Sequence, residues 1–455
     1  MDSINGRNRF VLRFSKNTLM YFFYTILVFV LAHCVWPKYQ NAEFISYQYV
    51  LFYNPSKMIF CFIIATAFIL LINNTYFNSN TFSGKVILFL TMLYFIPGMA
   101  ICSALNIEWS YILFFSIYFI VLLVADKIIK HPKKFPMVVR EERVSIIFRI
   151  ILCVCLVYPI VIMLLFDKGF SFVNVIATLN DPYGIRAQAR ENSMPWAFLL
   201  IETWGVYFGA LMITYSLKNK KRFLAIAFII IQLFYFSLQG NRIYLFITGV
   251  AIILGFIDAK NKYIAWAFVG VVLAQFLEYT IFIDEEFLGL VTNIYRRYSV
   301  VPNLLSPKYV DFFQRNTPDF LRGFFENISR FFGVESEYGA NFGVIIGQQY
   351  FHMNMNANTG MIGGAFLEFG YGGVIIDPIM MVFSLRVFEK ILMRADKAYI
   401  ILVAFIYTSL AINSWSLWAQ CIRISYLLLF IISLYLMFNT EKGMPGKKIK
   451  KKALL

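Results

Sequence analysis

The residues with the greatest capacity for chemistry gather around His352, one of three histidines in the chain. Asn356 and Thr359 follow it in the polar run 348–360. An imidazole titrates near neutral pH, so His352 is a candidate general acid or base. Glu368 is a second candidate, as the base or as its helper. The alternative for His352 is a hydrogen-bonded loop residue without a chemical role.

Four arginines form a second group. Arg186 and Arg190 are four residues apart and would share one face of a helix. Arg242 and Arg423 each stand at the end of an apolar segment. Because a guanidinium binds phosphate through two parallel hydrogen bonds, these arginines predict a site for a diphosphate. For each one alone, an ion pair or a side chain reaching the membrane surface is the favoured interpretation.

Composition indicates that the main solvent of the chain is lipid. Of its 455 residues 60% are hydrophobic and 15% charged, with a mean hydropathy of +0.68. These values exclude a soluble globular enzyme, a disordered protein and a secreted disulfide scaffold. The basic residues that give the formal charge of +16 lie mostly between apolar segments. This placement favours a role in membrane topology over binding to a nucleic acid. No metal-ligand cluster, nucleotide-binding motif or Ser/His/Asp spacing is present.

The apolar runs predict about twelve transmembrane helices in a single polytopic domain, 1–455. About twenty apolar residues cross a bilayer as a helix. The two weakest boundaries are the short connection near Asn106, between the third and fourth spans, and residues 239–242, where one long helix would otherwise replace two. The predicted spans are 17–36, 58–73, 86–104, 109–125, 145–166, 196–216, 223–238, 243–257, 263–283, 366–385, 398–414 and 422–438.

Basic residues orient this bundle. With both termini in the cytoplasm, most of the 41 lysines and arginines fall on the cytoplasmic side, as the positive-inside rule requires. Two exterior segments are then too long to be turns, 167–195 and 284–360. Within the longer one, residues 318–333 have helical apolar spacing. They predict an amphipathic helix, either at the exterior membrane surface or packed over the membrane domain.

The motif residues resemble a known family. Residues 358–373, preceded by His352 and Asn356, are similar to the segment after the large periplasmic loop of Wzy-type oligosaccharide repeat-unit polymerases. Gly240-Asn-Arg242 resembles the Gly-x-Arg of the same family. The resemblance covers the topology of most of the chain, but as a motif only about thirty residues. The related O-antigen ligases share the architecture.

The resemblance implies an all-α integral membrane protein of the bacterial inner membrane, with a large periplasmic loop carrying amphipathic helices. Such enzymes transfer a growing O-antigen or capsule chain from undecaprenyl diphosphate to a new lipid-linked repeat unit at the periplasmic face. They are inverting glycosyltransferases that need no metal or cofactor. His352 would be the base or would position the acceptor, and Arg242 would hold a diphosphate. Arg186 and Arg190 match the family's earlier periplasmic loop only loosely.

Implied partners are undecaprenyl-diphosphate-linked oligosaccharides as donor and acceptor, membrane lipids and a chain-length regulator. Three alternatives stay open: an O-antigen ligase, a flippase or transporter of polyprenyl-linked oligosaccharides, and an inactive assembly protein. Transporters usually have pseudo-repeated halves and short loops. This chain has loops of unequal length and no visible internal repeat, so the polymerase is the favoured hypothesis.

Overall fold

The chain is helical throughout the part that the structure describes. Among those residues every regular element is a helix, and one isolated β-bridge joins Leu51 to Leu105. The all-α class predicted from the apolar runs is therefore confirmed. The computed structural model describes residues 16–39, 41–132, 150, 153, 157, 196–239, 242–257, 260–281, 290–320, 342–352, 357, 360–413 and 426–438.

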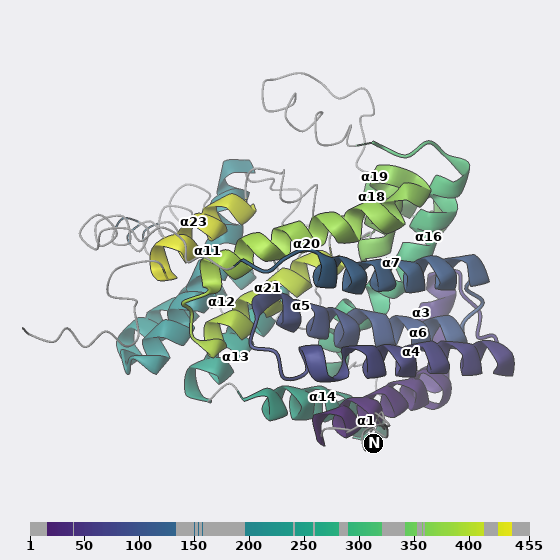
Figure 1. Ribbon diagram of the computed structural model, residues 1–455, viewed down its shortest axis with the longest axis horizontal. Coiled ribbons are helices and arrows are strands. Elements are labelled where there is room, and N and C mark those ends of the chain that lie inside the picture. The colour runs from purple at the N-terminus through teal and green to yellow at the C-terminus, as the bar shows by residue number, and fades with distance from the viewer. Residues whose placement is uncertain are drawn as a thin grey trace, which may run out of the picture.

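Long helices run side by side along the molecule. Figure 1 shows α4, α5, α7 and α20 roughly parallel to its long axis. The elements are α1 (Lys16–Val30), η1 (Leu31–Val35), α2 (Trp36–Tyr39), α3 (Asn41–Ser46), α4 (Pro55–Tyr76), α5 (Phe82–Leu90), η2 (Thr91–Phe95), α6 (Ile96–Ala104), α7 (Trp109–Ile128), α11 (Trp196–Lys218), α12 (Arg222–Gln239), α13 (Arg242–Phe256), α14 (Asn261–Ile281), α15 (Leu290–Tyr295), η3 (Arg296–Val300), α16 (Val301–Arg315), α18 (Phe342–Phe351), α19 (Gly360–Phe369), η4 (Gly370–Gly372), α20 (Gly373–Leu392), α21 (Lys397–Asn413) and α23 (Tyr426–Phe438).

Several helices are suited to crossing a membrane. Within the described residues, six have the required length and apolar composition, and three shorter apolar helices join them. The helix composition is therefore that of a multi-pass membrane protein. The six are Asn17–Lys38, Pro55–Ile72, Phe82–Ala104, Trp109–Ile128, Asn261–Ile281 and Gly360–Leu392, and the shorter three are Arg222–Phe236, Tyr244–Phe256 and Lys397–Asn413.

Most of the predicted spans overlap helices of the structure. All but one of the twelve overlap a described helix, and the exception, 145–166, lies almost wholly outside the described residues. The boundary at 239–242 separates two helices as expected. α12 ends at Gln239 and α13 begins at Arg242, and both pack against α11. The exterior segment 167–195 lies outside the described residues.

Helix α7 shows how the bundle meets lipid. Leu113, Ile117, Ile120 and Val124 follow one another at helical spacing, and each is 41–50% exposed. The opposite face of α7 is buried against α20. An exposed apolar stripe of this length is a liability in water. In hydrocarbon it is the expected outer surface of a spanning helix.

One end of the bundle joins segments that are far apart in sequence. We call it the Asn106 end and define it by residues 41–57, 105–111 and 304–320. The amide N of Asn106 donates to the carbonyl of Val50 over 3.1 Å. The hydroxyl of Tyr49 donates to the carbonyl of Leu304 over 2.8 Å, which ties α16 to the same end. The positive-inside interpretation of the sequence predicts the exterior side for all three segments.

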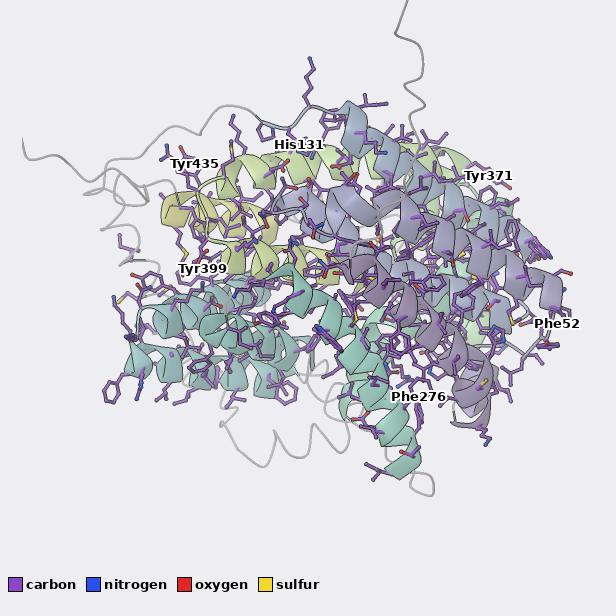
Figure 2. All side chains as sticks on the ribbon, turned by 60° about the horizontal axis from the view of Figure 1, so that its bottom comes forward. Phe52, His131, Phe276, Tyr371, Tyr399 and Tyr435 are labelled. Carbon is purple, nitrogen blue, oxygen red and sulfur yellow. The ribbon has the colours of Figure 1, made fainter. Side chains whose placement is uncertain are left out.

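The opposite end, the Lys218 end, is defined by residues 76–85, 126–132, 215–222 and 386–400. Lys218 Nζ lies 2.6 Å from Asp396 Oδ2, and Lys85 Nζ donates to Asn261 Oδ1 over 2.9 Å. Every partner in these pairs comes from a segment that the sequence assigns to the cytoplasmic side. Figure 2 shows the separation, with Phe52 toward one end and Tyr399 and Tyr435 toward the other.

A helix from the predicted exterior segment 284–360 lies inside the bundle. α15, η3 and α16 follow one another without a break, and Ser299, Asn303 and Ser306 are completely buried. The segment packs against α6 and α19. The stretch 284–360 is therefore not an exposed connection throughout. Its mixture of polar and apolar residues did not indicate a membrane span. In the structure, its buried polar groups lie next to other polar groups.

Two π-helical turns explain how this buried helix is accommodated. A π-turn leaves backbone carbonyls without their usual helical partners, so other donors must satisfy them. The carbonyl of Met92 in η2 accepts from the Tyr24 hydroxyl over 2.5 Å. The carbonyls of Tyr94 in η2 and Ser299 in η3 accept from Asn303 Nδ2 over 3.1 and 2.8 Å. Asn303 therefore joins the two π-turns.

Candidate functional site

The structure locates three of the eight residues predicted for the site. His352 follows α18 and is exposed, Glu368 is 1% exposed on α19, and Arg242 is the first residue of α13. α18 and α19 both pack against α16, so His352 and Glu368 belong to elements around one helix. The others, Arg186, Arg190, Asn356, Thr359 and Arg423, lie outside the described residues.

His352 ends its helix in a left-handed conformation. Its φ is 54°, and its backbone N donates to the carbonyl of Gln348 over 3.1 Å. A positive φ is uncommon in residues other than glycine, although histidine is among those that adopt it more often. The chain thus leaves α18 sharply at His352, with the imidazole at the surface.

Glu368 differs from the expectation of an acid near the exterior surface. Its side chain is almost fully buried on α19, although its backbone reaches the Asn106 end. There its carbonyl accepts from the N–H of Phe320 over 2.9 Å, and the carbonyl of Leu367 accepts from Asp319 over 2.7 Å. These bonds tie α19 to the end of the α16 segment. Beyond Phe320, the amphipathic helix predicted over 318–333 lies outside the described residues.

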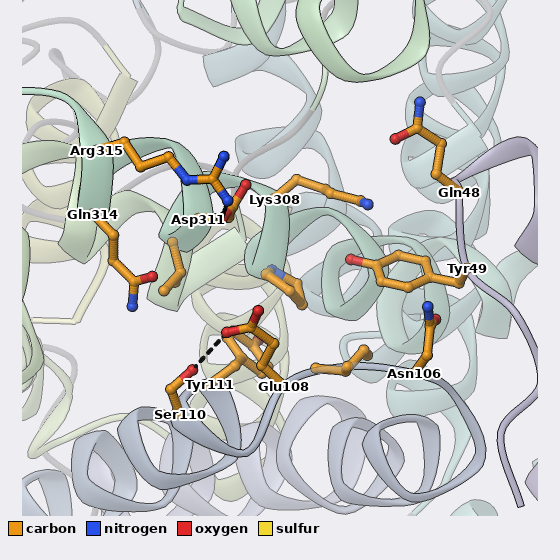
Figure 3. A pocket seen from close by; sticks show the side chains of 13 residues that line it. Gln48, Tyr49, Asn106, Glu108, Ser110, Tyr111, Lys308, Asp311, Gln314 and Arg315 are labelled. Atoms are coloured by element: carbon orange, nitrogen blue, oxygen red, sulfur yellow. Dashed lines mark hydrogen bonds and ion pairs between the residues drawn. The ribbon is translucent and has the colours of Figure 1, made fainter.

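One pocket in the described part of the chain lies at the Asn106 end. Its volume is about 220 Å³. Figure 3 shows side chains from three segments around it. The lining residues are Gln48, Tyr49, Asn106, Ile107, Glu108, Ser110, Tyr111, Pro307, Lys308, Val310, Asp311, Gln314 and Arg315. We call this site the Lys308 pocket.

Helix α16 supplies one wall of the pocket because of its residue spacing. Lys308, Asp311 and Arg315 lie three and four residues apart and so share one face of the helix. Arg315 Nη2 is 2.6 Å from Asp311 Oδ1, an (i, i+4) ion pair. The opposite face, which includes Ser306 and Tyr309, is buried against α19. One amphipathic helix thus anchors the site in the core and presents its charges to the pocket.

Aromatic rings surround the Lys308 ammonium. Its Nζ is 4.5 Å from the ring centre of Tyr49 and 5.6 Å from that of Tyr350. Burial lowers the pKa of Lys308, and the nearby Asp311 carboxylate opposes this shift. Burial also holds the pKa of Tyr49 well above its usual range. The cation is therefore stabilised by ring faces while it is partly removed from water.

The second wall is the turn between α6 and α7. Ser110 Oγ donates to Glu108 Oε2 over 3.1 Å, a contact drawn in Figure 3. From α4, Lys57 Nζ donates to the carbonyls of Leu105 and Ile107 over 2.8 and 2.5 Å. A buried ammonium that bridges two carbonyls fixes the course of the turn. Lys57 is therefore a positioning residue for this wall.

Comparisons with known proteins identify no relative. No family model matches the chain, and no curated protein or solved structure matches it. The chemistry of the site therefore depends on its own residues.

Sequence reasoning missed Glu108, Lys308, Asp311 and Arg315. Each is an ordinary charged residue in its local sequence, and only the fold brings the turn and α16 together. The one usable signal was the spacing of the charges on α16, which indicates an amphipathic helix inside the long exterior segment.

The pocket is equipped to bind a polar ligand. Gln48, Asn106 and Gln314 bring side-chain amides to its lining, and the carboxylates of Glu108 and Asp311 accept only. The amide N of Gln48 already donates to the carbonyl of Tyr350, and Asn106 Oδ1 already accepts from the N–H of Val50. Lys308 and Arg315 add donors. Among the described residues, no group of three His, Cys, Asp or Glu side chains is placed to hold a metal ion.

Proposed function

We propose that the protein polymerises oligosaccharide repeat units linked to undecaprenyl diphosphate, at the periplasmic face of the bacterial inner membrane. The products are O-antigen or a related surface polysaccharide. Two observations support this proposal: the helix composition of a multi-pass membrane protein, and the motif resemblance around His352 and residues 358–373.

The orientation proposed has twelve spans, both termini in the cytoplasm and the Asn106 end in the periplasm. The positive-inside distribution of basic residues supports it. The side-chain pairs at the Lys218 end agree with the predicted spans, because they join only segments assigned to the same side of the membrane. In this orientation the segment 284–360 contributes α16 to a pocket open on the periplasmic side.

The proposed chemistry has two parts. A base, His352 with Glu368 as a helper, removes the proton of the acceptor hydroxyl, which typically contributes about 10²–10⁴-fold. Charge that develops on the departing diphosphate is stabilised by guanidinium groups, for which Arg186, Arg190, Arg242 and Arg423 are the proposed residues. Asn356 and Thr359 are proposed to bind substrate beside His352.

The main support for the proposal is the set of segments that form the Lys308 pocket. Its walls come from the three segments at the Asn106 end, all assigned to the exterior by the basic residues, and α18 delivers His352 beside one of these walls. A polymerase needs a polar substrate site at this surface. A transporter needs one near the middle of the membrane.

Deletion of the gene in the cells that encode the protein tests the function. We expect the ladder of long glycan chains to disappear, while single repeat units still reach the lipid A-core. The gene should restore the ladder, and its His352→Ala variant should not. If glycan leaves the lipid A-core altogether and long lipid-linked chains accumulate, the protein is a ligase. If neither long chains nor single units reach the periplasm, it is a flippase.

A further inference from the structure

We propose that the Lys308 pocket binds one neutral sugar ring of the lipid-linked chain and excludes the diphosphate. This inference rests on the proposed polymerase function and assigns the sugar to this particular set of residues. Three properties of the pocket support it: its charge, its hydrogen-bonding groups and its size.

The charges in the pocket cancel. Lys308 and Arg315 are cationic, and Glu108 and Asp311 are anionic. Arg315 is already paired with Asp311 over 2.6 Å, so its guanidinium fork is partly occupied. Lys308 is the second cation, and its ammonium lies over the Tyr49 ring. A diphosphate requires an excess of positive charge, which this pocket does not provide.

The carboxylates in the pocket favour a ligand that can donate hydrogen bonds. Some of their oxygens already accept, Asp311 from Arg315 and Tyr350 and Glu108 from Ser110. Carboxylate oxygens of Glu108 and Asp311 line the pocket together with the amide groups of Gln48, Asn106 and Gln314. Ionised phosphate oxygens only accept, and they would be repelled by the carboxylates. A sugar hydroxyl both donates and accepts, so it can satisfy carboxylates, amides and the ammonium together.

The shape of the pocket suits a ring. Its volume of about 220 Å³ equals that of roughly seven waters, at about 30 Å³ of liquid volume each. This is enough for a single sugar ring. Tyr49 and Tyr111 close the wall; both are almost fully buried, and the Lys308 ammonium lies over the Tyr49 ring.

Ligand-observed NMR on the purified full-length protein in detergent tests the inference. The probes are methyl glycosides of glucose, galactose, mannose, rhamnose, N-acetylglucosamine and N-acetylgalactosamine, each measured with and without inorganic diphosphate. We expect at least one glycoside to bind and diphosphate not to displace it. Because Glu108→Gln and Asn106→Ala each remove hydrogen bonds to the ring, each should weaken that binding by about tenfold.

Removal of both carboxylates makes the test sharper. The double variant E108Q/D311N leaves Lys308 and Arg315 without carboxylates, so it should lose glycoside binding and gain binding of inorganic diphosphate. Asp396→Asn, which removes one carboxylate at the opposite end, is the matched control and should behave as wild type. Thermal unfolding of each variant verifies that it is folded.

Three results would overturn the inference: no glycoside binds, diphosphate displaces the bound glycoside from the wild-type protein, or the folded pocket variants bind as wild type does. The glycan ladder reports separately on the function. If the protein restores the ladder but fails the binding test, the proposed function stands and only this assignment of the pocket is wrong.

Discussion

The hydroxyl of Tyr350 donates to Asp311 Oδ2 over 2.7 Å and thereby joins α18 to the pocket face of α16. Burial, and then this hydrogen bond, raise the pKa of Tyr350. The same carboxylate pairs with Arg315. His352 follows Tyr350 by two residues, so the backbone that carries the histidine is fixed to a wall of the pocket.

His352 is predicted to act through its imidazole and not through its backbone conformation. Asparagine tolerates the left-handed φ of 54° seen there, whereas alanine does not do so readily. We expect both His352→Ala and His352→Asn to lower the rate of polymerisation by about 10²-fold or more, because neither supplies a base. Chain-length analysis of the glycan gives the measurement. If His352→Asn makes a normal ladder, the role of this residue is conformational and the proposed chemistry is wrong.

Gly360 is predicted to be essential for the packing of α19 on α16. Its φ is +65°, and a Cβ would lie 2.3 Å from Ser306 Oγ and 3.0 Å from the carbonyl of Pro302. Gly360→Ala should therefore lower the free energy of unfolding by about 1–3 kcal/mol. Gly249, in the interior of α13, has open space at its Cβ position. Gly249→Ala should leave stability equal or raise it by up to about 1 kcal/mol. Unfolding in a detergent titration compares the two, and equal effects would contradict the packing described.

Arg386 is predicted to be the main electrostatic anchor of the Lys218 end. It is 8% exposed, and its guanidinium lies 2.9 Å from Asp126 and 3.1 Å from Glu389. Arg386→Met leaves two buried carboxylates without their cation, which typically costs about 3–5 kcal/mol. Lys390→Met, at an exposed position on the same helix, should cost less than about 0.5 kcal/mol. The same unfolding titration measures both, and a small loss for Arg386→Met would show that the ion cluster contributes little.

Asp396 is predicted to make a small contribution to the free energy of unfolding, and this contribution depends on pH. The hydrogen bond from Lys218 lowers its pKa in the folded protein. The contribution is therefore present above the unfolded value of about 3.9 and is lost as the pH falls through the lower folded value. Because the Asp396 side chain is 60% exposed, Asp396→Asn should cost less than about 1 kcal/mol at pH 7. Thermal unfolding at pH 7 and pH 3 checks this, and a larger difference at pH 3 would contradict the sign.

Apolar periodicity was enough to predict the helices. The run ending at Gln239 and the run beginning at Arg242 are separate helices, as the polar tetrapeptide between them indicated. The charge distribution also anticipated which segments meet, since Lys218 and Asp396 come from loops assigned to the same side. Both signals are local or additive, so a single sequence contains them.

The buried helix and the pocket could not be predicted in this way. Asn303 and Ser306 are polar, and nothing local indicates that Tyr94 and the π-turns provide their partners. The pocket needs Glu108 and Lys308, and these two residues are far apart in the sequence. His352, which was chosen for its chemical type, follows Tyr350, whose hydroxyl bonds to a wall of the pocket, and it is not in the lining. Chemical type suggests a role, while only the fold determines which side chains meet.

The side of the membrane that the Lys308 pocket faces decides whether this account holds. Asn316, at the end of α16, and Asn219, at the end of α11, are comparable positions at the two opposite ends of the bundle. Each is exposed, and each donates through its side-chain amide over 2.8 Å to the carbonyl four residues earlier. Asn316→Cys and Asn219→Cys, each in a chain whose six native cysteines are replaced by serine, are treated in intact cells with a maleimide that cannot cross the inner membrane.

We expect the cysteine at 316 to be labelled in intact cells, and the cysteine at 219 only after the inner membrane is permeabilised. The reverse pattern would put the pocket in the cytoplasm, where no periplasmic polymerase could use it, and would contradict the proposed function.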